Sequence, residues 1–219
     1  MRWTFKSKPP SEKISKLSNE LSIDKNIATL LVQRGIETYQ EAKTFFRPDI
    51  NQLHNPFLMQ DMLKAVERIE KAIAEGENIL VYGDYDVDGT TAVSLVSSYL
   101  KTYYANVATY IPDRYEEGYG ISYQGIDFAK DNDFSLIIAL DCGVKAIDKV
   151  SYASEKDIDF IICDHHRPGD ELPKTIAVLD PKREDCSYPY DELCGCGIGF
   201  KLVQALASRR GQTIDDLMG

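Results

Sequence analysis

Long apolar runs are missing from this sequence. No stretch approaches the ~18–20 apolar residues that a membrane-spanning helix needs, and residues 1–6 lack the apolar segment of a signal peptide. Basic residues are outnumbered as well, since 25 Lys and Arg stand against 35 Asp and Glu in 219 residues, a net charge of −10. These absences exclude a membrane-spanning chain and a basic protein that coats nucleic acid, and they predict a cytoplasmic protein.

Cysteines are few and odd in number, which argues against a disulfide framework. Five are present, and three of them, Cys186, Cys194 and Cys196, lie near one another in the chain. Their spacing does not match a standard zinc-binding pattern. We therefore expect small residues that pack a glycine-rich turn, with zinc binding as the alternative.

The negative charge is unevenly distributed. Residues 1–60 carry nine basic and six acidic side chains, whereas residues 61–219 carry sixteen and twenty-nine. Carboxylates placed within apolar segments are costly unless they are paired or bind a cation. The distribution therefore indicates metal binding in the longer part of the chain.

Residues 1–60 are predicted to form a helical extension. Apolar positions recur at helical spacing between residues 12 and 46, Gly35 is placed to end one helix, and Pro48 is placed to end another. Residues 47–60 then form a connector to the main domain.

Residues 61–219 are predicted to form an α/β domain. An amphipathic helix over 61–75, with Asp61 as candidate cap and Gly76 as candidate stop, opens this domain. Short apolar runs of strand length then alternate with helical patterns, which predicts a parallel sheet of about five strands flanked by helices. The expected strands are 79–82, 107–111, 136–140, 160–163 and 176–179, and the expected helices are 90–103, 122–132, 145–156 and 198–209.

Polar residues follow each expected strand. Because the carboxyl ends of parallel strands meet at one edge of the sheet, these residues are expected to converge there. They lie in the segments 83–91, 112–120, 141–143, 164–166 and 180–183.

The converging side chains predict a site for two metal ions. Asp84, Asp86 and Asp88 alternate in one tight loop, Asp141 could bridge two ions with its two oxygens, and His165 adds an imidazole. Oxygen ligands with one nitrogen favour Mn²⁺ or Mg²⁺. Two such ions can activate water and clamp a phosphoryl oxygen.

Each piece alone has a simpler interpretation. The aspartate loop could be a calcium loop, but Leu95 would take the place of the Glu that ends an EF-hand loop. Asp141 could instead cap the helix expected over 145–156, and residues 164–166 could be a capped turn with histidine in the core. Together at one sheet edge, the pieces favour the metal site.

Glycine-rich segments offer weaker evidence for phosphate binding. Residues 195–199 enter the last helix, and we assign Gly197 and Gly199 to phosphate binding, with a tight packing turn as the alternative. The helix that opens at residues 89–91 could likewise turn its amides toward phosphate. The loop 117–120 could be merely flexible, and Lys182 and Arg183 could form only a solvated turn.

Residues 84–89 (DYDVDG), 141–143 (DCG) and 164–166 (DHH) together resemble the motifs of the DHH phosphoesterases. The resemblance covers nearly the whole chain and is closest to the family members that degrade single-stranded DNA from the 5′ end. It implies a DHH-type, Rossmann-like fold and a phosphodiester hydrolase acting 5′→3′ in DNA repair and recombination. The segments that carry this finer resemblance are 31–36, 55–58, 61–62, 112–114, 117–120, 179–183 and 195–202.

The resemblance also implies roles for the matching residues. Asp86, Asp88, Asp141 and His165 match the ligands of two Mn²⁺ or Mg²⁺ ions, with Asp141 as the bridge. His166 matches a histidine that contacts the scissile phosphate and can assist as an acid. The remaining matches are Asp84, an outer carboxylate that supports the loop, and Arg114, Gly118, Tyr119 and Gly120, which lie where nucleic acid approaches.

Single-stranded DNA is the partner that the resemblance implies. Single-strand-binding protein and a helicase are further candidate partners, and a monomer without membrane association is expected. One family ligand, an Asp in a segment resembling Gly-Thr-Ile-Ala-Asp, has no match, because residues 213–217 follow a helix rather than a strand. The family's second domain and oligonucleotide-binding fold are also unmatched, so we expect an N-terminal part that can be inactive on its own.

Three other functions compete with the exonuclease. A related enzyme would cleave short oligonucleotides, cyclic dinucleotides or pyrophosphate, and a non-catalytic relative would be a replication scaffold. The helical region 12–75 and the loop 117–120 favour the exonuclease, and the full set of ligands argues against a scaffold. A Rossmann dinucleotide binder is disfavoured because residues 83–86 lack the Gly-x-Gly-x-x-Gly fingerprint.

Overall fold

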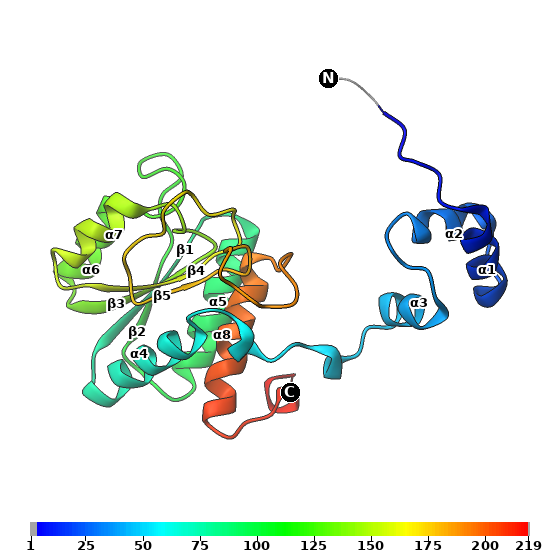
Figure 1. Cartoon of the computed structure of the whole chain (residues 1–219). Coiled ribbons are helices and arrows are strands. Elements are labelled where there is room, and N and C mark those ends of the chain that lie inside the picture. The colour runs from blue at the N-terminus through cyan, green and yellow to red at the C-terminus, as the bar shows by residue number, and fades with distance from the viewer. Residues whose placement is uncertain (1–3, 219) are drawn as a thin grey trace. The chain divides into compact units, whose positions relative to one another are not determined.

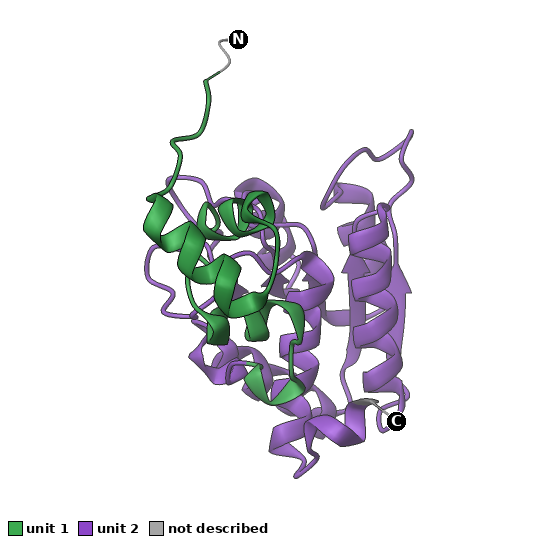
Figure 2. Cartoon of the chain, turned by 90° about the vertical axis from the view of Figure 1, so that its right-hand side faces the viewer, with its two compact units in different colours: residues 1–53 green, residues 54–219 purple. Residues whose placement is uncertain are grey.

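The computed structural model describes residues 4–218 and contains two compact units, Met1–Leu53 and His54–Gly219 (Figures 1 and 2). The division lies before the expected boundary at residue 60, because residues 54–60 pack with the second unit. Met59 is buried in its core, and the carbonyl of His54 accepts a hydrogen bond from Lys201 Nζ at 2.8 Å.

The first unit is helical, as predicted, and consists of α1 (Ser11–Leu21), α2 (Lys25–Val32), α3 (Tyr39–Phe46) and the 3₁₀ turn η1 (Ile50–Gln52). Gly35 takes a left-handed conformation (φ +82°) just after α2, and the next amide bonds back to the carbonyl of Leu31 at 3.0 Å. This closes α2 in the way that glycine favours. The small core of the unit contains Ile14, Leu17, Ala28, Leu31, Val32, Ile36 and Ala42.

The second unit contains the five predicted strands in one parallel sheet. Its strand order is β2-β1-β3-β4-β5. The strands are β1 (Asn78–Gly83), β2 (Val107–Tyr110), β3 (Phe134–Leu140), β4 (Asp159–Cys163) and β5 (Ala177–Leu179).

Helices cover both faces of this sheet, which explains why the strands are apolar throughout (Figure 1). Along β3, Leu136, Ile138 and Leu140 pack under one helical layer, whereas Ile137 and Ala139 pack under the other. The first layer contains α4 (Met62–Glu75), α5 (Val87–Lys101) and α8 (Gly195–Arg209), and the second contains α6 (Tyr123–Asp131) and α7 (Ile147–Ser154). The turn η2 (Pro56–Leu58) precedes α4, and α9 (Ile214–Met218) follows α8.

The strand order places a topological switch point between β1 and β3, where the sheet extends in opposite directions. The chain leaves β1 to form β2 on one side, and β3 then joins β1 on the other side. Such a switch point is where open α/β sheets bind ligands. The segments containing Asp84–Asp88 and Asp141 leave the sheet at this point.

Three local expectations need correction. Asp61 precedes α4 but makes no side-chain capping bond in the described structure; its carboxylate instead pairs with Lys64 (2.8 Å) and with buried Arg183 (2.7 Å). The helix expected from residue 90 already begins at Val87. Asp141 does not cap α7, because that helix begins at Ile147, after Ala146.

Within residues 4–218, no helix combines the length and apolarity that a membrane crossing requires.

Candidate metal centre

The loop after β1 places Asp84 and Asp86 in different environments. Asp84 is fully buried, and its Oδ1 accepts a hydrogen bond from the amide of Tyr85 at 2.7 Å. Asp86 precedes α5 and caps it by accepting a bond from the amide of Gly89 at 2.9 Å. A Cβ at Gly89 would lie 2.5 Å from the carbonyl oxygen of Asp84, so this tight loop requires glycine. The expectation that the amides of residues 89–91 face phosphate is therefore wrong for Gly89, whose amide is bound to Asp86.

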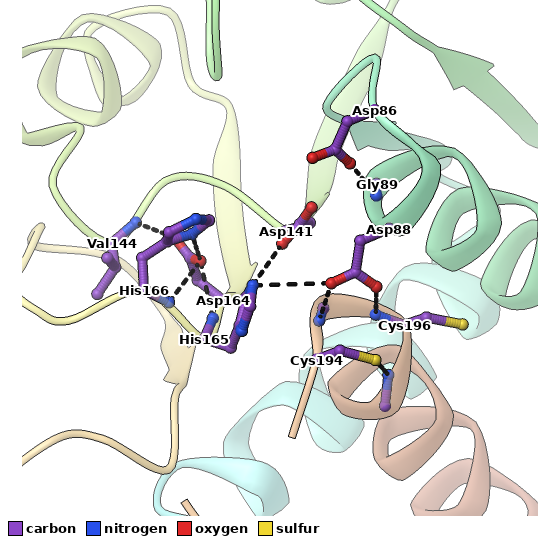
Figure 3. Close-up of polar contacts among 12 residues, drawn as sticks. Asp86, Asp88, Gly89, Asp141, Val144, Asp164, His165, His166, Cys194 and Cys196 are labelled. Atoms are coloured by element: carbon purple, nitrogen blue, oxygen red, sulfur yellow. Dashed lines mark hydrogen bonds and ion pairs between the residues drawn. The ribbon is translucent and has the colours of Figure 1, made fainter. Parts of the chain in front are cut away.

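Asp88 lies in the first turn of α5 and points at the start of α8 (Figure 3). Its two oxygens accept hydrogen bonds from the amides of Gly195 (2.6 Å) and Cys196 (2.7 Å). Burial opposes the charge, but these two amides lower the pKa of Asp88. The N-terminus of α8 therefore holds an anion that the chain itself supplies.

Asp141 follows β3 and forms the buried centre of the site. Its side chain is 2% exposed, and its Oδ1 has no hydrogen-bond partner among residues 4–218. His165 Nε2 lies 3.1 Å from that oxygen without the alignment of a hydrogen bond. Burial first, and then the carboxylates of Asp88 and Asp86, raise the pKa of Asp141 to about 7. A buried, unpaired carboxylate oxygen of this kind is costly unless a cation or a proton occupies it.

His165 and His166 follow β4 and face different partners (Figure 3). His165 Nε2 lies 3.1 Å from Asp141 Oδ1 and 3.7 Å from Asp88 Oδ2. His166 Nδ1 instead lies 2.7 Å from Oδ1 of buried Asp164. Asp164 is itself held by the amide of Val144 at 2.9 Å.

Among the described residues, one group of three acidic or histidine side chains is arranged to hold a single metal ion. It consists of Asp141, His165 and His166, whose ligand atoms lie within 4.8 Å of one another. Two of the four expected ligands, Asp141 and His165, therefore belong to the group. Asp88 lies next to it, with its Oδ2 3.7 Å from His165 Nε2. Asp86 lies outside it, although its charge contributes to the raised pKa of Asp141.

The expected nucleic-acid residues lie at the rim of the site. The guanidinium carbon of exposed Arg114 lies 5.3 Å from the centroid of the Tyr85 ring, and Tyr85 meets Tyr119 edge-on at 6.0 Å. The Tyr119 hydroxyl reaches His166 Nε2 at 3.4 Å. Burial first, and then the carboxylate of Asp84, raise the pKa of Tyr119.

The two glycines of α8 that were assigned to phosphate binding make local contacts within the chain. Gly199 is buried within α8, and a Cβ there would meet Val96 of α5 at 3.2 Å, so it serves the packing of two helices. The amide of Gly197 donates to Cys194 Sγ at 3.3 Å. The alternative interpretation, a tight packing turn, is the one that fits.

Two residues that contact the site, and one further buried carboxylate, were not predicted as site residues. Asp164 orients His166, and Gly195 lets Asp141 approach α8, because a Cβ on Gly195 would lie 2.5 Å from Asp141 Oδ1. Asp180 is fully buried after β5, and burial raises its pKa to about 6. The positions of Asp164 and Asp180 directly after strands were the available signal.

The cysteine-rich turn is not a metal site in the described part of the chain. Cys186, Cys194 and Cys196 do not join any group of three close ligands there.

A cavity of about 780 Å³ lies between the segments that follow His166 and Asp180. Arg167 and Lys182 are among the residues that line it.

A family model for the DHH family, N-terminal domain, matches residues 78–218, the region that contains the sheet and the site. The chain belongs to the DHH family. The predicted resemblance to the DHH phosphoesterases is thereby confirmed, and the parallel sheet confirms the predicted α/β fold.

This DHH chain is similar to proteins named single-stranded-DNA-specific exonuclease RecJ. It is 41% identical over 218 residues to the protein of Bacillus subtilis. The matched region covers 100% of this chain and 27% of that relative. It is 38% identical over 144 residues to that of Escherichia coli, covering 65% and 25%. The chain therefore spans about a quarter of the length of these curated relatives.

Solved structures give the same result for the fold. RecJ of Thermus thermophilus in complex with Mn²⁺ superposes with a TM-score of 0.74 at 24% identity, covering 97% of this chain and 29% of that one. An exonuclease RecJ bound to manganese gives 0.64 at 30% identity, covering 71% and 39%.

Proposed function

We propose that this chain carries the catalytic site of a divalent-metal-dependent exonuclease that hydrolyses single-stranded DNA in the 5′→3′ direction. The observation that carries the proposal is the buried Asp141, whose Oδ1 lacks a hydrogen-bond partner within residues 4–218 beside His165 at the switch point of the sheet. The substrate class is supported by the names of the similar exonucleases. The 5′→3′ direction follows from the family resemblance.

The donor atoms are of the kind that Mn²⁺ or Mg²⁺ accepts, and Asp141, His165 and His166 lie close enough together to hold one such ion. Asp86, Asp88 and Asp141 offer carboxylate oxygens and His165 offers one nitrogen, which is the chemistry that these ions accept. A bound cation would also relieve the repulsion that, with burial, raises the pKa of Asp141. We propose that these four residues would hold two such ions, with the buried Asp141 at the centre of the set. The Mn²⁺- and Mg²⁺-bound RecJ structures support this choice of ions.

His166 is proposed to contact the scissile phosphate and to protonate the leaving oxygen. When bound, the two ions would supply activated water and neutralise charge on the phosphoryl oxygens. Asp164 holds His166 Nδ1 at 2.7 Å, which leaves Nε2 for the substrate. Burial opposes protonation of this ring, but Asp164 raises the pKa of His166 overall and so favours the acid form.

The rim of the site is proposed to bind the DNA strand. Tyr85 and Tyr119 offer aromatic rings on which bases of single strands can stack, and Arg114 adds positive charge beside them. Arg167 and Lys182 of the neighbouring cavity could pair with backbone phosphates. Gly118 and Gly120 shape the loop that carries Tyr119.

The wider setting is proposed from the family resemblance. It is a cytoplasmic, monomeric enzyme of DNA repair and recombination that works with single-strand-binding protein and a helicase. Residues 54–219 are the DHH phosphoesterase domain in this proposal, and the preceding residues are its helical extension.

Hydrolysis assays with Mn²⁺ test the proposal. The chain is given single-stranded DNA labelled at either end, duplex DNA, and linear and cyclic dinucleotides. We expect mononucleotide release from the 5′ end of single strands, abolished in Asp141→Ala and reduced about 10²–10⁴-fold in His166→Ala. Asp148→Ala, at an exposed aspartate of α7, is the matched control.

The competing functions predict other results. Cleavage of dinucleotides alone would indicate the small-substrate enzyme and would contradict the exonuclease proposal. Mn²⁺ binding without hydrolysis of any substrate would fit a scaffold and equally an exonuclease part that is inactive on its own, because the chain spans about a quarter of its relatives' length.

A further inference from the structure

Tyr119 is carried by a loop whose two sides are held in place. Before Tyr119, the carboxylate of Glu117 accepts a hydrogen bond from the hydroxyl of Tyr110 in β2 at 2.9 Å. After it, the hydroxyl of Tyr82 in β1 donates to the carbonyl of Gly120 at 2.8 Å. Both anchors come from neighbouring strands of the sheet, so the position of Tyr119 is set by the core of the unit.

Left-handed backbone on both sides determines how the loop presents Tyr119. Gly118 has φ +82° and Gly120 has φ +79°, conformations that residues with a Cβ rarely adopt. Tyr119 is 54% exposed, and its ring meets that of His166 at 89° with the centroids 6.4 Å apart. Its hydroxyl lies 3.4 Å from His166 Nε2.

The imidazole of His166 is thus contacted at both nitrogens. Asp164 Oδ1 lies 2.7 Å from Nδ1 and also accepts the backbone amides of His165 (2.8 Å) and His166 (3.1 Å). Because Asp164 Oδ1 acts as an acceptor in these contacts, the His166 nitrogen that faces it must be the donor. The imidazole proton therefore lies on Nδ1. In the neutral ring, Nε2 is then an acceptor, and the Tyr119 hydroxyl can donate to it.

We propose that Tyr119 is a positioning residue for His166. The Tyr119 hydroxyl holds His166 Nε2 toward the metal centre until a substrate phosphate takes the place of the hydroxyl. This assignment rests on the proposed role of His166 in phosphodiester hydrolysis. The contact of 3.4 Å is longer than an ordinary hydrogen bond, so the hydroxyl holds Nε2 only weakly. Tyr119 would therefore act through His166 in addition to any contact with the DNA.

The imidazole nitrogens of the metal-free chain provide a direct test. The sequence contains three histidines, so a ¹⁵N spectrum of the side chains at alkaline pH resolves His166 from His165 and His54. Tyr119→Phe keeps the ring and removes only the hydroxyl. We expect it to shift the Nε2 resonance of His166 and to leave His54 unchanged.

The matched control is Tyr115→Phe, because Tyr115 lies in the same loop and is 93% exposed. An unchanged His166 resonance in Tyr119→Phe, or an equal change in Tyr115→Phe, would overturn the proposal. The first result would mean that the hydroxyl serves another group, such as Asp84. Since the spectrum needs neither metal nor DNA, its outcome is independent of whether the chain proves to be an exonuclease.

Discussion

At the residue scale, burial and the repulsion from neighbouring carboxylates both act against ionisation of Asp141. Both raise its pKa to about 7, far above the ordinary value of an aspartate. Between the ordinary pKa and about 7, the folded state therefore holds a proton that the unfolded chain has lost. In this window the metal-free protein loses stability as the pH rises.

Asp141→Asn should remove this loss. The amide cannot ionise, so we expect the metal-free variant to match the unaltered chain near pH 4 and to exceed its free energy of unfolding by roughly 2–4 kcal/mol at pH 8. Urea denaturation with a chelator present measures this. Exposed Asp148→Asn should show no such difference, and parallel pH profiles for Asp141→Asn and the unaltered chain would refute the account.

Sequence reasoning predicted that the candidate residues lie at one edge of the sheet but did not predict their partners. The aspartates and histidines were found because they directly follow apolar strands. The bond between Asp88 and the amide of Gly195 joins residues 107 positions apart, and no local pattern reports it. The same holds for Asp61, whose pairing with Arg183 replaces the capping bond that its position suggested.

At the element scale, the start of α8 connects the two halves of the metal centre. Its first amides bind Asp88, and Gly195 lies against Asp141. The glycine-rich segment was predicted to lead into a helix from residue 198, whereas α8 already begins at Gly195. The local sequence is equally compatible with phosphate binding and with tight packing, and the contact of Gly199 with α5 favours packing.

Two substitutions at the start of α8 test whether Gly195 and Gly197 have different roles in metal binding. Gly195→Ala would place a Cβ 2.5 Å from Asp141 Oδ1, whereas at Gly197 the nearest atom, in the Leu193 side chain, lies 3.4 Å from the added Cβ. We expect Gly195→Ala to weaken Mn²⁺ binding about 10–100-fold, as for residues that support metal ligands, and Gly197→Ala to change it little. Calorimetry on both folded variants measures this, and equal affinities would show that the close approach at Gly195 is unimportant.

At the scale of the whole molecule, the alternation of strands and helices was enough to predict the fold. All five strands were expected within two residues of their ends, because strands buried on both faces are apolar throughout. The order β2-β1-β3-β4-β5 was not predicted, since strand order depends on which side each crossover packs. That order brings the loop after β1 beside Asp141 and so creates the candidate site.

The central claim is that this assembled edge of the sheet binds divalent cations through Asp141. Calorimetric titration of Mn²⁺ into the chain, beside Asp141→Ala and the control Asp148→Ala, tests it most directly. The account predicts saturable binding to the unaltered chain and to Asp148→Ala, lost in Asp141→Ala. Unchanged affinity in Asp141→Ala, or no binding to the unaltered chain, would contradict it.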